Sequence, residues 1–429
     1  MSKLSRRTAV GVFLVFAFAY FLSTLLRAVM ATLSPALSSE FGLHAGELGL
    51  LAGGYFIGFA VTQLPLGAWL DRHGPVKVVL AFLTIAVAGC VAFAMSNGFG
   101  SLLASRVLIG MGVSACLMAP LTGYRRWFNA GTQLRATSWM LMTGSLGMLA
   151  STLPMQWLLP RVGWRVPFWG LAALILLGMV LIARFAPKWQ PSAGETAGSE
   201  AAPAGPPAVK EGLLAGYAEV WRNPFFRHVM MLGFVNYGGM VAIQTLWAGP
   251  WMTEVAGASP LQSARGLFAI NLAMLCTFWA WGWVFPWLTR RGVGLDELVT
   301  WGQPLGFILM ALIIILGPAA GEWAFVLLAL YCMSLTSASM AQASLGMQFE
   351  TRIAGRAMSG YNLVIFLGVF VMQWGIGLAI DLFRLLDWTN VAAYRGSLTV
   401  YLLATVGAYA HFLATRAGPS GHTADNPAS

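Results

Sequence analysis

The chain has 429 residues, of which 58% are hydrophobic and only 9% are charged, and its mean hydropathy is +0.73. Soluble proteins are about half apolar and about a quarter charged, so this composition excludes a water-soluble enzyme, a secreted domain and a disordered chain. The net charge of +10 does not indicate a nucleic-acid partner, because the basic residues stand singly or in pairs between apolar runs.

Apolar runs long enough to cross a bilayer recur along the whole chain. A hydrocarbon core of about 30 Å needs a helix of ~20 apolar residues, and twelve runs reach this length. The runs are continuous rather than alternating, as helices require. We therefore predict an all-α polytopic membrane protein with 12 transmembrane helices. The predicted spans are 10–36, 46–69, 75–95, 99–122, 136–159, 165–186, 226–251, 264–287, 294–316, 322–347, 357–382 and 395–415.

The basic residues orient these spans. With the N-terminus inside, the inner loops hold 18 of the 25 Lys and Arg residues, the outer loops hold five, and Arg27 and Arg106 lie within spans. Because Lys and Arg concentrate on the cytoplasmic side, both termini are predicted to be cytoplasmic. The first run follows a basic start but has no small-residue cleavage site, which indicates a retained helix. We expect a multi-pass protein of the plasma membrane, which is the inner membrane in a Gram-negative bacterium.

One stretch, 187–224, interrupts the apolar pattern and leaves six spans on each side. It is rich in Pro, Ala, Gly and Ser and cannot bury enough apolar surface to order itself, apart from a short surface helix at 213–221. Two groups of six spans are the organisation of transporters built from two halves. The predicted domains are an N-terminal six-helix bundle at 1–186, a cytoplasmic linker at 187–224, a C-terminal six-helix bundle at 225–416 and a disordered cytoplasmic tail at 417–429.

The first span contains an arginine. Arg27 lies in FLSTLLRAVMATLSPAL between Tyr20 and Pro35, and the next span reads LGLLAGGYFIGFAVTQLPLG. This arrangement resembles the first hairpin of organic-anion and organophosphate members of the major facilitator superfamily. The resemblance implies that Arg27 contacts an anionic substrate, to which a guanidinium offers a planar pair of donors. The residues alone leave open a second interpretation, in which Arg27 reaches toward the outer headgroups.

The loop between the second and third predicted spans carries a motif. It reads Gly67-Ala-Trp-Leu-Asp71-Arg72-His-Gly74-Pro-Val-Lys77, which resembles the cytoplasmic loop signature of the same superfamily. Gly67 permits close helix contact, Asp71 can meet helix N-termini across the bundle, and Gly74 starts a tight turn. The resemblance implies that Gly67, Asp71, Arg72 and Gly74 act in gating or coupling.

Arg106 lies in the fourth predicted span, in the sequence RVLIGMGVSACLMAP with Gly110 and Gly112. This resembles the fourth-helix motif of the superfamily and implies a role in coupling or gating. A buried arginine costs ~2.5–3.5 kcal/mol on insertion scales, so it needs partners, and an equally open interpretation is that Arg106 locks helices by bonding to backbone carbonyls. The fifth span, with GSLGMLASTLP, matches the Gly-rich pattern of drug antiporters poorly.

The corresponding loop of the second half echoes the first. It reads Gly282-Trp-Val-Phe-Pro286-Trp-Leu-Thr-Arg290-Arg291, with Pro286 where the first loop has Asp71. Similar loops at matching places support a duplicated fold. We add Arg290 to the candidate gating residues and expect the acidic group to act in the first half alone.

Polar and aromatic side chains of the spans complete the predicted site. The seventh span has no basic residue beyond its inner end, so we expect a small monoanionic, carboxylate-like substrate held by one arginine. Amides supply both donors and acceptors, although each can instead pair with a neighbouring helix. The candidate substrate-binding residues are Arg27, Tyr20, Asn236, Tyr237, Gln244, Trp247, Asn362 and Gln373.

These features predict a transporter. None of the 15 carboxylates falls clearly within the middle of a span, the four cysteines lack metal-type spacing, and the chain has no phosphate-binding loop ending in Lys-Ser or Lys-Thr. We expect no metal, no cofactor and no enzymatic activity. The predicted protein is a monomer in the lipid bilayer that moves a small organic anion by alternating access, either alone, with a coupling proton or in exchange for another anion. Proton-coupled efflux of drugs or hydrophobic metabolites is the alternative function, and a membrane sensor on the same fold is a further one.

Overall fold

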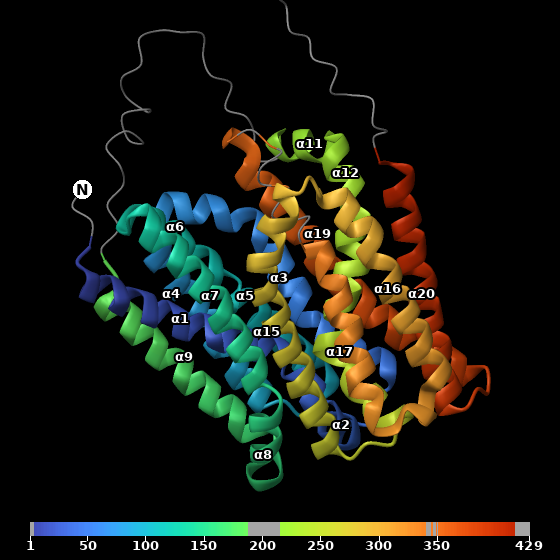
Figure 1. Cartoon of the computed structure of the whole chain (residues 1–429). Helices are drawn as coiled ribbons and strands as arrows, with labels where there is room; N and C mark the ends of the chain where they lie inside the picture. The colour runs from blue at the N-terminus through green and yellow to red at the C-terminus, as the bar shows by residue number, and fades with distance from the viewer. Residues whose placement is uncertain (1–3, 188–214, 340–344, 346–348, 350, 417–429) are drawn as a thin grey trace, which may run out of the picture.

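The computed structural model describes residues 4–187, 215–339, 345, 349 and 351–416 (Figure 1). All regular elements of these residues are helical. The first group of helices comprises α1 (Arg6–Ala28), α2 (Met30–Phe41), α3 (Ala45–His73), α4 (Pro75–Ala94), α5 (Phe99–Val113), α6 (Ala115–Trp127), α7 (Ala130–Ala150), α8 (Leu153–Val162) and α9 (Arg165–Phe185).

Three of the predicted spans in this group are divided into two helices. At Val29, between α1 and α2, the N–H of Thr32 donates to the carbonyl oxygen of Val29 over 3.1 Å, which is a tighter turn than the α-helical one. A similar tight turn at Ser114 separates α5 from α6, with Ser114 N–H donating to Met111 O over 3.3 Å. At Thr152 the backbone leaves helical geometry, with φ −103° and ψ −107°, before α8 begins.

The second group contains more irregular helices. It comprises α11 (Ala215–Arg222), α12 (Pro224–Met231), η2 (Leu232–Tyr237), α13 (Gly238–Ala242), η3 (Ile243–Trp247), α14 (Ala248–Pro250), η4 (Trp251–Val255), α15 (Pro260–Arg290), α16 (Leu295–Leu316), η5 (Gly317–Trp323), α17 (Ala324–Leu335), η6 (Thr336–Ser339), α19 (Thr351–Leu385) and α20 (Asn390–Ala414). Here η2, η3 and η4 are π-helical, whereas η5 and η6 are 3₁₀ turns. The seventh predicted span is therefore one continuous helix with three wide turns. The short helix α11 lies where the sequence predicts a surface helix.

The surface of the bundle suits lipid. Within the described residues, ten helical segments are long and apolar enough to cross a membrane. Large apolar side chains such as Trp283, Trp301 and Leu385 are mostly exposed, and exposed apolar area on this scale marks a surface that is covered by something other than water. One of the ten segments, Asp296–Ala338, runs for 43 residues through α16, η5 and α17.

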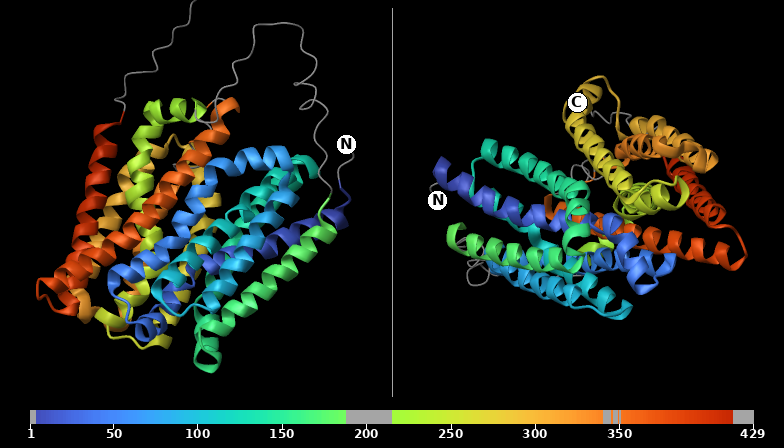
Figure 2. Two further views of the ribbon diagram at one scale, coloured as in Figure 1. Left: turned by 180° about the vertical axis from the view of Figure 1, so that it is seen from behind. Right: turned by 90° about the horizontal axis from the view of Figure 1, so that it is seen from below.

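The helices form two groups that lie against each other. Figures 1 and 2 show α1 to α9 on one side and α12 to α20 on the other, with α3 and α19 side by side between them. The turns between α2 and α3, between α8 and α9, and between α19 and α20 lie at one end of the bundle, which we name the distal end. The opposite end, where α9 finishes and α11 begins, is named the linker end.

Helices α3 and α19 approach closely at the distal end. An added Cβ on Gly377 of α19 would contact the carbonyl oxygen of Ala45 and would lie 2.8 Å from its carbonyl carbon, so the glycine lets the two backbones touch. The carboxylate of Asp381 accepts the backbone N–H groups of Ala45 over 3.1 Å and Gly46 over 2.6 Å. Because these N–H groups begin α3, the carboxylate of α19 caps a helix of the other group.

A separate polar contact ties the first group together at the distal end. Glu40, which follows the first predicted span, accepts the indole N–H of Trp164 over 2.6 Å and pairs with Arg165 over 2.7 Å. The hydrogen bond from Trp164, together with the Arg165 guanidinium, lowers the pKa of the Glu40 carboxyl from its ordinary value, although partial burial opposes this shift. The contact joins α2 to the start of α9.

Candidate functional site

Arg27 lies at the centre of the candidate site. It occupies the last turn of α1, two residues before the break at Val29, and a cation is favoured at a helix C-terminus. The guanidinium carbon lies 5.5 Å from the ring centroids of both Phe59 on α3 and Phe366 on α19, within the range of cation–π attraction. Its Nε is buried and has no hydrogen-bond partner. Arg27 therefore contacts both helix groups and keeps an unused donor.

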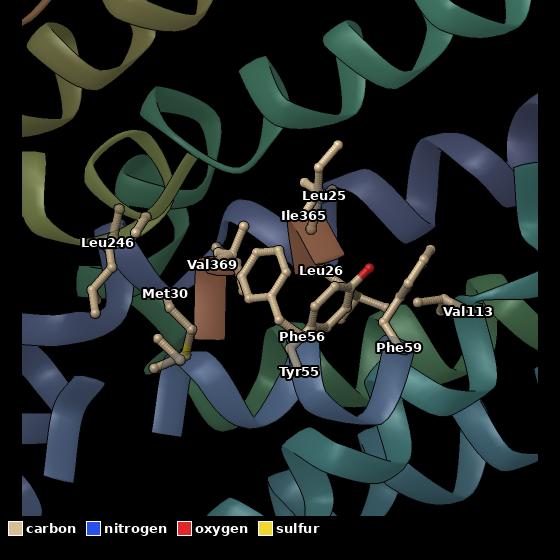
Figure 3. Packing of buried hydrophobic residues seen from close by; sticks show 14 of the residues in the cluster. Leu25, Leu26, Met30, Tyr55, Phe56, Phe59, Val113, Leu246, Ile365 and Val369 are labelled. Atoms are coloured by element: carbon tan, nitrogen blue, oxygen red, sulfur yellow. The ribbon is translucent and has the colours of Figure 1, made fainter. Parts of the chain in front are cut away.

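Tyrosines surround this arginine. The phenol groups of Tyr20, Tyr55 and Tyr237 lie within electrostatic range of the guanidinium. Tyr55 is fully buried on α3, and its hydroxyl donates to the carbonyl oxygen of Ser23 over 3.2 Å. Figure 3 shows Tyr55 and its neighbours on α3 pointing toward the end of α1. Of the predicted binding residues, the structure thus brings Tyr20 and Tyr237 together with Arg27.

Arg106 supports the same region from α5. Its Nη1 donates to the carbonyl oxygen of Leu26 over 3.0 Å, directly before Arg27, and its guanidinium lies 5.3 Å from the Tyr55 ring centroid. The side chain is fully buried, and its Nε and Nη2 have no partner. Gly110, in the predicted motif, makes this geometry possible, because an added Cβ there would collide with the carbonyl of Tyr55. Arg106 consequently fixes the C-terminal turn of α1 through a backbone bond, which agrees with the helix-locking interpretation.

Two of the predicted amide ligands form pairs inside the second helix group. Asn236 donates to the side-chain oxygen of Gln303 over 2.8 Å. Gln244 donates to Asn271 over 3.0 Å. Both amides are buried, and their donors are used by neighbouring helices.

The remaining predicted ligands also lie in the second group. Gln373 donates to the Thr245 hydroxyl over 3.0 Å, and its backbone carbonyl accepts the Trp247 indole N–H over 3.1 Å. Asn362 is buried on α19, one turn before Phe366. These polar side chains connect α19 with the irregular seventh helix.

Apart from Arg106, the predicted gating residues lie at the linker end. Gly74 ends α3 and starts α4 with φ 78°, a left-handed conformation that favours glycine. Arg72 and Arg290 are exposed at the ends of α3 and α15, and the side chain of Asp71 lies outside the described part of the structure. An added Cβ on Gly67 would meet no described atom within 4 Å.

The aromatic residues around Arg27 are not among the predicted site residues. Tyr55 and Phe59 are four residues apart on α3 and therefore face the same side, which is a signal that the sequence does carry. Phe366 joins them from α19, with its ring centroid 4.4 Å from that of Phe59. No local sequence pattern predicts this contact between residues that are far apart in the chain.

Comparison with known families identifies the fold. The sequence profile of the Major Facilitator Superfamily matches residues 16–416. The chain belongs to this superfamily. The resemblance seen in the loop motifs is thereby confirmed, and membership of the superfamily together with the apolar helices makes the chain a multi-pass membrane protein.

Relatives within the superfamily include anion carriers. The chain is 24% identical over 405 residues to the probable anion transporter 4 of chloroplasts from Oryza sativa subsp. japonica, an alignment that covers 91% of this chain and 66% of that protein. It is 30% identical over 164 residues to the 4-hydroxybenzoate transporter PcaK of Acinetobacter baylyi, covering 38% of this chain and 35% of that protein. The chain thus spans just under two thirds of the first relative and about a third of the second.

Solved structures of the superfamily share the helical arrangement. A bacterial homolog of the human lysosomal transporter Spinster, in an inward-facing and unoccupied conformation, matches with a TM-score of 0.74 at 17% identity, over 97% of this chain and 100% of that one. The likeness confirms the predicted all-helical superfamily fold.

Proposed function

We propose that this protein is a secondary transporter that carries a small organic anion across the membrane by alternating access. The observation that carries the proposal is Arg27, whose guanidinium lies between the two helix groups with a buried donor unused. A buried donor without a partner is uncommon in folded proteins, and a carboxylate is the acceptor that a guanidinium fits best. Anion and 4-hydroxybenzoate transport by the relatives supports the same substrate class.

The proposed topology has twelve spans. The 43-residue segment Asp296–Ala338 would be ~65 Å long as one helix, about twice the thickness of the hydrocarbon core. It is divided by η5, where Gly317 and Gly321 have positive φ values of 48° and 47°, so it supplies two spans. Helices α7 and α8 supply one more beyond the ten apolar segments.

The proposed orientation follows the basic residues and places both termini in the cytoplasm. The distal end then faces outward and the linker end faces the cytoplasm, in the plasma membrane or in the inner membrane of a Gram-negative bacterium. We propose six-helix halves at 1–186 and 225–416, joined by the linker 187–224. The protein acts as a monomer, with either a proton or an exchanged anion as the coupled species.

Alternating access requires contacts that close one end at a time. The capping of α3 by Asp381 and the touching backbones at Gly377 close the distal end in this conformation. We propose that these contacts separate when the outer side opens, while Asp71 and the other loop residues close the linker end. When each end of the bundle has its own closing contacts, the protein can switch by rigid-body movement between two packed states, one closed at each end.

The test of the proposal uses purified protein in proteoliposomes. Uptake of labelled benzoate, gluconate, succinate, glycerol 3-phosphate and ethidium is measured for wild type and for Arg27→Lys, Arg27→Gln and the control Arg161→Gln. Arg161 is an exposed arginine at the end of α8. At least one carboxylate should be transported, and Arg27→Gln should weaken its binding by roughly 2–5 kcal/mol, the range for breaking a buried charge pair.

The lysine variant separates charge from geometry. Arg27→Lys should keep part of the binding, because the charge remains but the planar fork is lost. Arg161→Gln should behave like wild type. Transport of ethidium with no dependence on Arg27 would instead favour drug efflux, and equal carboxylate binding by all four proteins would remove Arg27 from the site.

A further inference from the structure

Four aromatic rings form a continuous group beside Arg27, whose guanidinium carbon lies 5.5 Å from the centroids of two of them. They belong to Tyr55, Phe56, Phe59 and Phe366, which we name the aromatic cage. The Phe366 centroid lies 4.4 Å from that of Phe59 and 6.2 Å from that of Phe56, the latter nearly parallel at 24°. Tyr55 lies 5.2 Å from Phe56 and 6.1 Å from Phe59. Figure 3 shows the three α3 members on one stretch of that helix.

The cage belongs to both helix groups. Three of its rings are on α3, and Phe366 is on α19. The contact between Phe59 and Phe366 therefore has to change when the two groups move apart. A flat group inserted between these two rings would preserve aromatic contact with both halves, whereas an aliphatic or hydroxylated group would replace it with weaker contact.

Three amides of the predicted site donate hydrogen bonds to other side chains of the protein. The side-chain N–H groups of Asn236, Gln244 and Gln373 donate to partners within the second helix group. Each of these amides thus uses one donor inside the protein, which leaves less of their hydrogen-bonding capacity for the hydroxyls of a sugar acid. A substrate whose carboxylate is attached to an apolar group does not need these hydrogen bonds, because its carboxylate is the one group that must be paired, and Arg27 can pair with it.

We propose that the aromatic cage and Arg27 together select an aromatic monocarboxylate over aliphatic and polyhydroxylated acids. The carboxylate accepts from the unused Nε–H edge of the Arg27 guanidinium. The ring enters between Phe59 and Phe366 when their contact, 4.4 Å between centroids in this conformation, opens. This inference rests on the proposed transport of organic anions and narrows its substrate class. Phe366 is the specificity-determining residue, since it is the single cage member from the second half.

The experiment compares three monocarboxylates that differ in the group attached to the carboxylate, together with one uncharged aromatic compound. Thermal stabilisation of the purified full-length protein is titrated with benzoate, cyclohexanecarboxylate and gluconate, and with benzamide as the uncharged aromatic. We expect benzoate to bind at least 10-fold more tightly than the other three. Phe366→Leu keeps an apolar side chain but removes the ring, and should weaken benzoate binding roughly 3- to 10-fold, the size of an aromatic pair contribution, while cyclohexanecarboxylate binding stays within about 2-fold.

A matched variant controls for the loss of a ring on α19. Phe370→Leu removes the next ring on the same helix, which packs against Trp374 at 5.8 Å, and should leave benzoate binding unchanged. The wild-type ligand series remains decisive even if Phe366→Leu fails to fold. Gluconate binding as tightly as benzoate, with dependence on Arg27, would overturn the aromatic selection and leave anion transport intact. Absence of Arg27-dependent binding for every carboxylate would overturn both.

Discussion

The substitution Gly377→Ala tests whether the distal contact is specific to one conformation. The added methyl group would lie 2.8 Å from the carbonyl carbon of Ala45 and 2.9 Å from Cα of Gly46, so α3 and α19 must separate by roughly 0.5–1 Å to relieve the overlap. Overpacking of this kind costs about 1–3 kcal/mol. If the cost falls on the distally closed state alone, the ratio of closed to open molecules drops roughly 5- to 150-fold.

Gly375→Ala is the matched control for this substitution. It lies two residues away on α19, where an added Cβ meets no described atom within 4 Å. Electron–electron double resonance between nitroxides at Arg161→Cys and Leu386→Cys measures the distal opening directly. The labels are placed in a Cys276→Ser background, because Cys276 is the exposed cysteine of the described chain.

We expect Gly377→Ala to shift the label distances to longer values and Gly375→Ala to leave them as in wild type. Detergent-solubilised Gly375→Ala should also unfold at the same temperature as wild type or slightly above it, because alanine is the better helix former. Identical distance distributions for the two alanine variants would refute the conclusion that backbone contact at Gly377 holds the distal end closed.

Three further predictions concern acidic residues. Asp381→Asn should open the distal end in the same resonance experiment, by about 1–2 kcal/mol, because the charge-assisted bonds to the N-terminus of α3 become neutral. Glu40→Gln should lower thermal stability at pH 7, and this difference should shrink as the pH falls. The lowered pKa of Glu40 means that its contribution is present above the ordinary carboxyl pKa and is lost as pH falls through the folded value. A pH-independent difference in melting temperature would contradict this. Asp71→Asn should slow transport without reducing the folded, inserted protein, and wild-type uptake rates would exclude a gating role for the loop.

The membrane-spanning fold can be predicted largely from composition, because apolar runs of about 20 residues are typical of helices that cross a bilayer. The interruptions within the runs do not follow from it. Pro35 lies inside α2, whereas the break lies at Val29, close to the Leu26 carbonyl that accepts a hydrogen bond from Arg106. The three π-helical turns of the seventh helix are equally hidden, because an apolar sequence satisfies either helix type.

The candidate site likewise has one part that the sequence predicts and another part that it does not. Arg27 stands out in the sequence because a charge within an apolar span is costly and needs a reason. The aromatic cage does not stand out, since the chain has 26 Phe and 10 Tyr residues. From the sequence alone, the buried amides are candidate ligands. In the structure, however, Gln244 donates to Asn271 on a different helix. Such a partner, distant along the chain, cannot be predicted from the sequence of one protein.

In the transport cycle and orientation that we propose, the lack of an acidic partner for Arg27 makes transport sensitive to voltage. In the described part of the chain, no carboxylate forms an ion pair with Arg27 or Arg106. The empty carrier therefore holds one more positive charge within the membrane than the carrier loaded with a monoanion. An elementary charge that crosses the full potential gains or loses about 2.3 kcal/mol per 100 mV. With a negative cytoplasm, the electric field acts more strongly on the return of the empty carrier than on the loaded step, and it draws the Arg27 charge toward the inner side.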